Sequence, residues 1–118
     1  MKTTQKQFEE FKEEFLKYQK LFNLEDWKVY FNMKPLARSY ADITTNIQCR
    51  VAVVNLSSDN SGEAIKDFNP KRSAKHEAAH LLIERLTALG KARYLDEYSM
   101  SEENERLAHL LTTLLPDA

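Results

Sequence analysis

The sequence predicts a two-layer α+β domain with the element order helix, three strands, helix, helix. Three patterns indicate this class: an aromatic stripe at helical spacing near the N-terminus, short apolar and β-branched stretches in the middle, and two apolar-periodic segments in the second half. A single sheet needs helices over one face to bury its apolar side chains. With 118 residues the chain has the length of one domain, so we expect residues 1–118 to form a single one.

The first helix is predicted from aromatic residues that recur at intervals of three and four, with Lys and Glu on the opposite face. The stripe consists of Phe8, Phe11, Phe15, Tyr18 and Phe22. Thr3 or Thr4 is the expected N-cap. No basic cluster accompanies the stripe, so we interpret it as a core-facing surface and not as a platform for stacking bases.

Three strands are predicted next. Residues 27–33 alternate between apolar and polar side chains, and residues 40–45 are rich in β-branched and aromatic types. Residues 50–56 are apolar on both faces, which favours a more buried strand. Asn46 to Cys49 is a candidate turn, and residues 57–68 are polar enough to form a loop.

The second half begins with a strong helix signal. Asn69 is placed to cap a helix whose first residue is Pro70, and the periodicity continues to about Leu89, where Gly90 can end the helix. Residues 92–100 are expected to be an irregular connection before a last helix capped by Ser101. The apolar stripe of that helix is Leu107, Leu110, Leu111 and Leu114, and Pro116 closes it.

The composition excludes several classes of protein. Hydrophobic residues make up 42% of the chain, with only two Gly and three Pro, which is typical of a globular protein. The net charge is −1 and no basic run indicates nucleic-acid binding. The only cysteine, Cys49, cannot form an internal disulfide, and no segment suits a signal peptide or a membrane span. We expect a soluble cytoplasmic protein with no membrane partner, and a phage gene product would look the same; the sequence leaves its oligomeric state open.

The residues most suggestive of chemistry are His76, Glu77 and His80 in a His-Glu-Ala-Ala-His string. Histidines four residues apart lie on the same face of a helix, so two imidazoles can reach one metal ion. Glu77 is rotated by one residue, where its carboxylate can accept a proton from a water that the metal activates. The string thus supplies two zinc ligands and a general base within five residues.

Helix phase places these histidines beside the buried face. Ala78, Leu82, Leu86 and Leu89 form the expected core face, and Ala79 and Ile83 extend it toward the histidines. Ligands at the edge of a buried face suit a cleft. The alternative is a chance string on a polar helix, with two ordinary surface histidines.

A catalytic zinc ion needs a third protein ligand and an open fourth position. Ile83 and Leu86 occupy the positions where a metzincin would carry Gly and His, so that branch is excluded. Ligand chemistry alone leaves a set of candidates in the last third of the chain: His109, Asp96, Glu97, Glu102, Glu103 and Glu105.

The segment from Lys75 to Leu115 resembles the gluzincin branch of metallopeptidases, especially its smallest members and short metallopeptidase-like proteins of phages. The resemblance implies a minimal zincin-like domain in which a Glu of the following helix completes the zinc site. Glu105 fits best because Leu107, Leu110 and Leu111 follow it at suitable positions, and Glu102 and Glu103 are the alternatives. His109 would then support the site from the next turn, although a third-ligand role or a purely structural role is also open.

The same resemblance implies an extended peptide bound along an exposed edge strand, without indicating which strand. Tyr94 or Tyr98 could donate a hydrogen bond to a developing oxyanion. The chain lacks the longer acidic motif that follows the zinc helix in larger gluzincins, and it has no second subdomain to wall a cleft.

The expected function is zinc-dependent hydrolysis of peptide bonds in a peptide or protein substrate, with Glu77 as general base. The main alternative is a zinc-containing but catalytically weak or inactive zincin-fold module that binds a peptide or a partner protein. A third interpretation is a metal-free interaction protein in which the motif is accidental.

Overall fold

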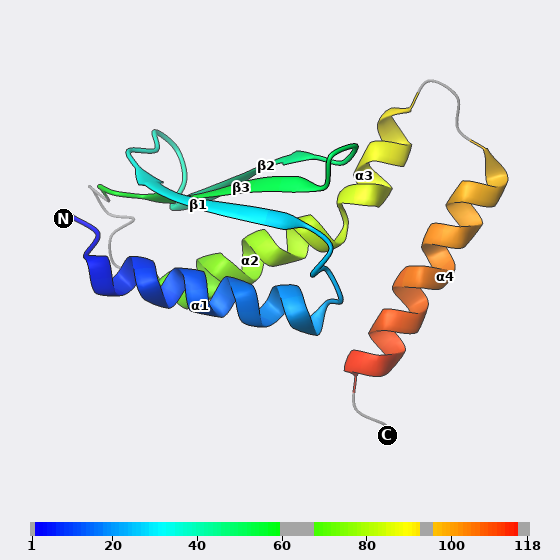
Figure 1. Cartoon of the computed structure of the whole chain (residues 1–118), viewed down its shortest axis with the longest axis horizontal. Helices are drawn as coiled ribbons and strands as arrows, with labels where there is room; N and C mark the ends of the chain where they lie inside the picture. Colours follow the sequence, from blue (N-terminus) through cyan, green and yellow to red (C-terminus); the bar gives the residue numbers. More distant parts are fainter. Residues whose placement is uncertain (1, 60–67, 93–95, 116–118) are drawn as a thin grey trace. The chain divides into compact units, whose positions relative to one another are not determined.

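The computed structural model describes residues 2–59, 68–92 and 96–115, which form two compact units, Met1–Leu82 and Ile83–Ala118. The first unit contains α1 (Gln5–Leu21), β1 (Lys28–Lys34), β2 (Ala41–Asn46), β3 (Val51–Ser57) and α2 (Pro70–Leu82). The second unit contains α3 (Glu84–Lys91) and α4 (Glu97–Leu114) (Figure 1). The predicted α+β class with an N-terminal and a C-terminal helix is confirmed. A single domain over the whole chain stays a prediction.

The sheet has the strand order β1-β3-β2. β1 pairs in parallel with β3, from Lys28 opposite Val51 to Lys34 opposite Ser57. β2 pairs antiparallel with the other side of β3. Among the described residues β2 is therefore an edge strand, and β3, which is apolar on both faces, is the central strand as its composition predicts.

The turn between β2 and β3 is the predicted one. The side chain of Asn46 accepts a hydrogen bond of 3.1 Å from the backbone N–H of Cys49. Arg50 then takes a φ of 56°, in the left-handed region, before β3 begins. This turn sets the register in which Asn46 lies opposite Val51.

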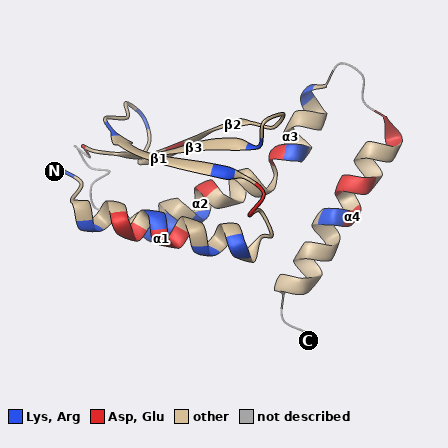
Figure 2. Ribbon diagram, in the orientation of Figure 1, with Lys and Arg blue, Asp and Glu red and all other residues tan. Residues whose placement is uncertain are grey.

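The hydrophobic core lies between the sheet and the helices α1 and α2, which cover the same sheet face (Figure 1). Phe11 and Phe15 of α1 are fully buried, and both rings meet Phe31 of β1 edge to face, with centroids 6.3 and 5.4 Å apart. Such pairs stabilise a core by about 0.5–1.5 kcal/mol beyond the area they bury. Charged residues are distributed along the rest of α1 (Figure 2). The aromatic stripe thus faces the core, as predicted.

Both ends of α1 are fixed by side chains. Thr4 is the N-cap: it accepts a hydrogen bond from the N–H of Gln7, and the Gln7 side chain accepts one from the N–H of Thr4. At the other end the buried amide of Gln19 donates to the carbonyl oxygens of Leu24 and Trp27, both at 3.0 Å. These bonds fix the connection from α1 into β1.

The prediction of one helix from Pro70 to about Leu89 is wrong in its middle. The helix breaks at Ile83, where φ and ψ are −93° and 5°, and α3 begins at the next residue. Gly90 does not end it either, because α3 continues to Lys91 and its C-cap is Ala92. The apolar periodicity runs through the break, so the pattern alone could not reveal it.

The last helix starts earlier than predicted. Asp96 is its N-cap and accepts a 2.6 Å hydrogen bond from the N–H of Ser99, so Ser101 lies inside α4 and not at its start. The predicted irregular connection is correspondingly shorter, and residues 93–95, including Tyr94, lie outside the described residues. The same applies to residues 60–67 of the predicted loop and to Pro116. None of the described helices is long and apolar enough to cross a membrane.

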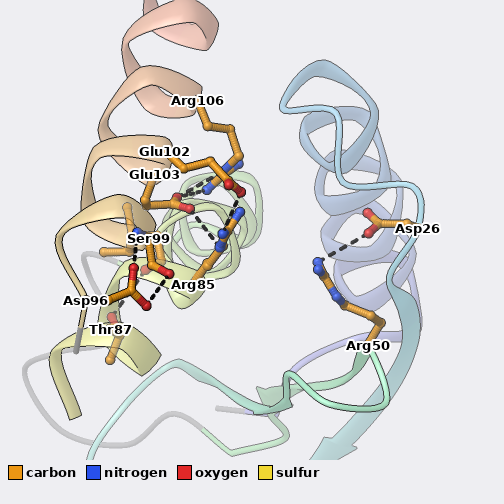
Figure 3. A network of polar contacts seen from close by, with 10 residues as sticks. Asp26, Arg50, Arg85, Thr87, Asp96, Ser99, Glu102, Glu103 and Arg106 are labelled. Atoms are coloured by element: carbon orange, nitrogen blue, oxygen red, sulfur yellow. Dashed lines mark hydrogen bonds and ion pairs between the residues drawn. The ribbon is translucent and has the colours of Figure 1, made fainter. Parts of the chain in front are cut away.

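An ion-pair network ties α3 to α4 within the second unit (Figure 3). Glu103 is completely buried and pairs with Arg106 on its own helix and with Arg85 on α3. Arg85 also donates to Glu102 at 2.8 Å. The carboxylate of Glu103 thus joins two guanidinium groups from two helices.

Candidate metal centre

The start of α2 is built as the sequence predicts. The side chain of Asn69 accepts hydrogen bonds from the backbone N–H groups of Lys71 and Arg72, at 3.1 and 3.2 Å. Pro70, the first helical residue, is buried. This cap fixes the helix phase two turns before the His-Glu-Ala-Ala-His string.

The buried face of α2 is rotated by about one residue from the predicted one. Ala74, Glu77, Ala78 and Leu81 are buried, whereas Leu82 is only partly buried and Ala79 is exposed. Leu86 and Leu89 belong to α3, which begins beyond the break. The rotation buries Glu77 and leaves both histidines on the exposed side of the same helix.

His76 and His80 present the same ring nitrogen to each other. Their Nε2 atoms are 3.0 Å apart, and the ring planes are nearly perpendicular, at 83°. Two nitrogens bound to one zinc ion at about 2.0–2.1 Å, at angles of about 95–110°, lie about 3.0–3.4 Å apart. The separation is compatible with two ligands of one metal ion, and it is also the length of a hydrogen bond between the two rings.

Glu77 completes the group. Ligand-type atoms of His76, Glu77 and His80 all lie within 4.8 Å of one another, so the three residues could hold a metal ion. Glu77 is only 5% exposed, and this burial raises the pKa of its carboxyl group. The neighbouring imidazoles of His80 and His76 act in the opposite direction, and the carboxylate of Asp42 adds to the increase.

Two of these residues, His76 and Glu77, line a cleft between α2 and the start of β2. The cleft has a volume of about 610 Å³. Its α2 side includes Arg72, His76 and Glu77, and its strand side is the segment 39–41. The strand that lines the cleft could not be predicted, because strand pairing is not local. The structure places the start of the edge strand β2 there.

The acidic candidates for a third ligand lie on α4 or at its cap, in the second unit. Glu102 and Glu103 are engaged with arginines, and Asp96 caps the helix. Glu105 and His109 are exposed on α4, and Tyr98 on the first turn is 77% exposed. The assignment of Glu105 as third ligand stays a prediction, as do those of Glu77 as base and His109 as support.

Arg72 was missed in the sequence as a residue of the cleft. It stands four positions before His76 and eight before His80, so all three share one stripe of α2. The spacing of four residues could have indicated that Arg72 lies on the same helix face as the histidines.

Comparisons with known proteins add no relative. The sequence matches no protein-family model, and no curated protein or solved structure shows significant similarity to it. The candidate site is therefore argued from its own residues.

Proposed function

We propose that the chain is a small zinc metallopeptidase, a zincin-like domain that hydrolyses peptide bonds. One observation carries the proposal: the Nε2 atoms of His76 and His80 lie 3.0 Å apart beside the buried carboxyl group of Glu77, at a cleft. Two imidazoles and a carboxylate form a borderline-soft donor set that suits zinc.

A bound zinc ion would polarise a substrate carbonyl and lower the pKa of a water toward neutrality. Glu77 is placed to act on that water because it is close to both histidines yet one residue out of phase with them. In the metal-free chain, burial raises the pKa of its carboxyl group. Glu77 would take a proton from the attacking water and later deliver it to the nitrogen of the leaving amine.

Glu105 is the proposed third ligand. Its competitors Glu102 and Glu103 are engaged in ion pairs with arginines, and ligation by either would disrupt the network of α3 and α4. Glu105 is exposed and makes no ion pair with a described residue. Support also comes from the apolar positions that follow it in the sequence.

The proposed substrate is an extended peptide. One side of β2 pairs with β3, and no described strand pairs with its other side; the residues that lead into β2 line the cleft beside His76. A peptide could add to that edge through backbone hydrogen bonds and present one of its carbonyl groups toward the histidines.

The test combines metal analysis with cleavage of a peptide library. Purified wild-type protein should hold about one zinc per chain, and His76→Ala/His80→Ala should hold none. Glu77→Gln should keep the metal and lose cleavage, while the matched change Glu84→Gln, which removes a carboxylate from α3, should keep both. Equal zinc content in the wild type and the double-histidine variant would refute the proposal.

The same experiment identifies the alternative function. Zinc bound to a wild-type protein that cleaves no member of the library, but retains peptides from it, would indicate a binding module of zincin fold. Both histidines are exposed, and this favours the alternative because the closure of an active site strengthens the electrostatic interactions that catalyse a reaction.

A further inference from the structure

The cleft beside the histidine pair contains a cationic side chain with no role in the proposed hydrolysis. Arg72 lines the cleft together with His76 and Glu77. It lies one helical turn before His76, on the stripe that continues to His80. A guanidinium group at this place borders the path of any peptide that reaches the histidines.

No described residue pairs with the side chain of Arg72. Three of the other described arginines have acidic partners, and Arg38 has none among the described residues: Arg50 pairs with Asp26 at 3.3 Å, and Arg85 and Arg106 pair with Glu103. The one acid that lines the cleft, Glu77, is buried and forms no ion pair with Arg72. Arg72 thus offers an unused bidentate donor to whatever occupies the cleft.

The backbone N–H groups at the start of α2 are not the donors that would bind an anion in the cleft. Asn69 already accepts from the N–H groups of Lys71 and Arg72, so the first turn has two of its free donors satisfied. The other polar side chains that line the cleft carry hydroxyl, amide or imidazole groups. They belong to Ser39, Tyr40, Asn69, Ser73 and His76. An anionic group in the cleft would therefore be recognised by the guanidinium of Arg72.

We propose that this cleft selects peptides that carry a carboxylate close to the bond presented to the metal, and that Arg72 binds this carboxylate. The inference rests on the proposed function, because it takes the metal to lie at His76 and His80. Four helical residues advance about 6 Å along the axis, and an extended peptide advances about 3.3–3.6 Å per residue. The carboxylate therefore belongs to an acidic side chain, or a free C-terminus, one or two residues from that bond.

The test uses two small probes that anchor on the metal and differ in one charge. Glutaric acid monohydroxamate carries a carboxylate about 5 Å from its metal-binding group, and its primary amide is a neutral control of the same length. Binding of both to zinc-loaded protein is measured by titration calorimetry. The wild type should bind the carboxylate probe about tenfold more tightly than the amide, as an exposed charge-assisted pair allows.

The preference should disappear in Arg72→Gln and be partly kept in Arg72→Lys, which retains the charge but not the fork of donors. Lys71→Gln is the matched control, since it removes one positive charge from the same turn at an exposed residue outside the cleft lining. Zinc content and circular dichroism of each variant should equal those of the wild type.

Two outcomes overturn the inference and leave the proposed function standing: equal affinity of both probes for zinc-loaded wild type, or a preference that Arg72→Gln retains. A preference lost equally in Lys71→Gln also overturns it, because a general electrostatic field would then explain the selectivity. Wild-type protein that holds no zinc in the same samples contradicts the proposed function itself.

Discussion

The two units of the chain are held together in opposite ways. All the described hydrophobic residues that are fully buried belong to the first unit, from Phe11 to Leu81. In the second unit the one buried described residue is an acid, Glu103, which pairs with Arg85 and Arg106. The first unit thus depends on apolar burial, and α3 and α4 depend in large part on a charge network.

This difference has consequences for stability and function. Exposed ion pairs weaken as salt is added and are lost when their carboxylate is protonated, whereas apolar burial involves no charge that salt could screen or pH could remove. The histidines and Glu77 lie in the apolar unit, on a helix packed against α1 and β2. A metal ion bound by these residues would lie on a helix that is packed against the hydrophobic core. The stability of the second unit should change separately when its charges are altered.

The largest effect is expected from Phe15→Ala in the first unit. Phe15 is fully buried and meets Phe31 at 5.4 Å, so its truncation leaves a cavity and should reduce the free energy of unfolding by about 3–5 kcal/mol. Urea denaturation measures this loss. Leu16→Ala, one residue away and 49% exposed, should change stability by less than about 0.5–1 kcal/mol. Similar losses in both variants would contradict the apolar-core account.

Removal of zinc should have the next largest effect. A metal that binds only the folded state at a free concentration 100-fold above its dissociation constant stabilises it by about 2.7 kcal/mol. A chelator should therefore lower the melting temperature of the wild type at neutral pH and leave His76→Ala/His80→Ala unchanged. Identical melting curves with and without chelator would speak against a well-occupied site.

Glu103→Gln should loosen the second unit alone. The variant leaves Arg85 and Arg106 without their shared carboxylate, but each arginine is about a third exposed, so water offsets part of the loss. We expect about 1–2 kcal/mol, less than the 3–5 kcal/mol typical of a fully buried pair. Hydrogen exchange should accelerate at amides of α3 and α4 and stay unchanged in α1 and β3. Glu105→Gln, measured without metal, is the control, and equal acceleration in it would contradict the network's role.

The smallest effect concerns the N-cap of α4. Hydrogen bonds from the N–H and hydroxyl of Ser99 hold the pKa of Asp96 below its usual value. A lowered pKa in the folded state means that the cap stabilises α4 above the unfolded pKa and loses this contribution as pH falls through the folded pKa. Helical signal from α4 should therefore decline in strongly acidic solution.

Asp96→Asn keeps a capping oxygen but cannot be protonated in this pH range. The helical signal of α4 should therefore decline less in acid in this variant than in the wild type. The comparison is best made by NMR shifts of α4 amides between neutral and acidic pH. An acid transition of the same size at Ser99 in both proteins would show that Asp96 does not carry it.

Local patterns predicted the first unit closely. The strands predicted at residues 27–33, 40–45 and 50–56 each begin and end one residue later in the structure, because side-chain alternation depends on neighbouring residues only. The grouping of His76 with His80 was predictable for the same reason, since one helix turn fixes it.

Features that depend on distant residues could not be predicted. The parallel pairing of β1 with β3, which makes β2 the edge beside the cleft, leaves no trace in either strand's own pattern. The break at Ile83 lies within unbroken apolar periodicity. Glu103 was one of several acidic candidates for the third ligand, and its burial depends on arginines three residues away and on another helix.

The strand order has a consequence for how the nascent chain folds on the ribosome. β1 and β2 are made first but do not pair with each other, because β3 lies between them. The β2–β3 hairpin can form locally, whereas β1 must wait with its apolar side chains exposed until β3 has emerged. α2, which carries the histidines, is synthesised after all three strands. The histidine pair is therefore synthesised only after the strands against which α2 packs.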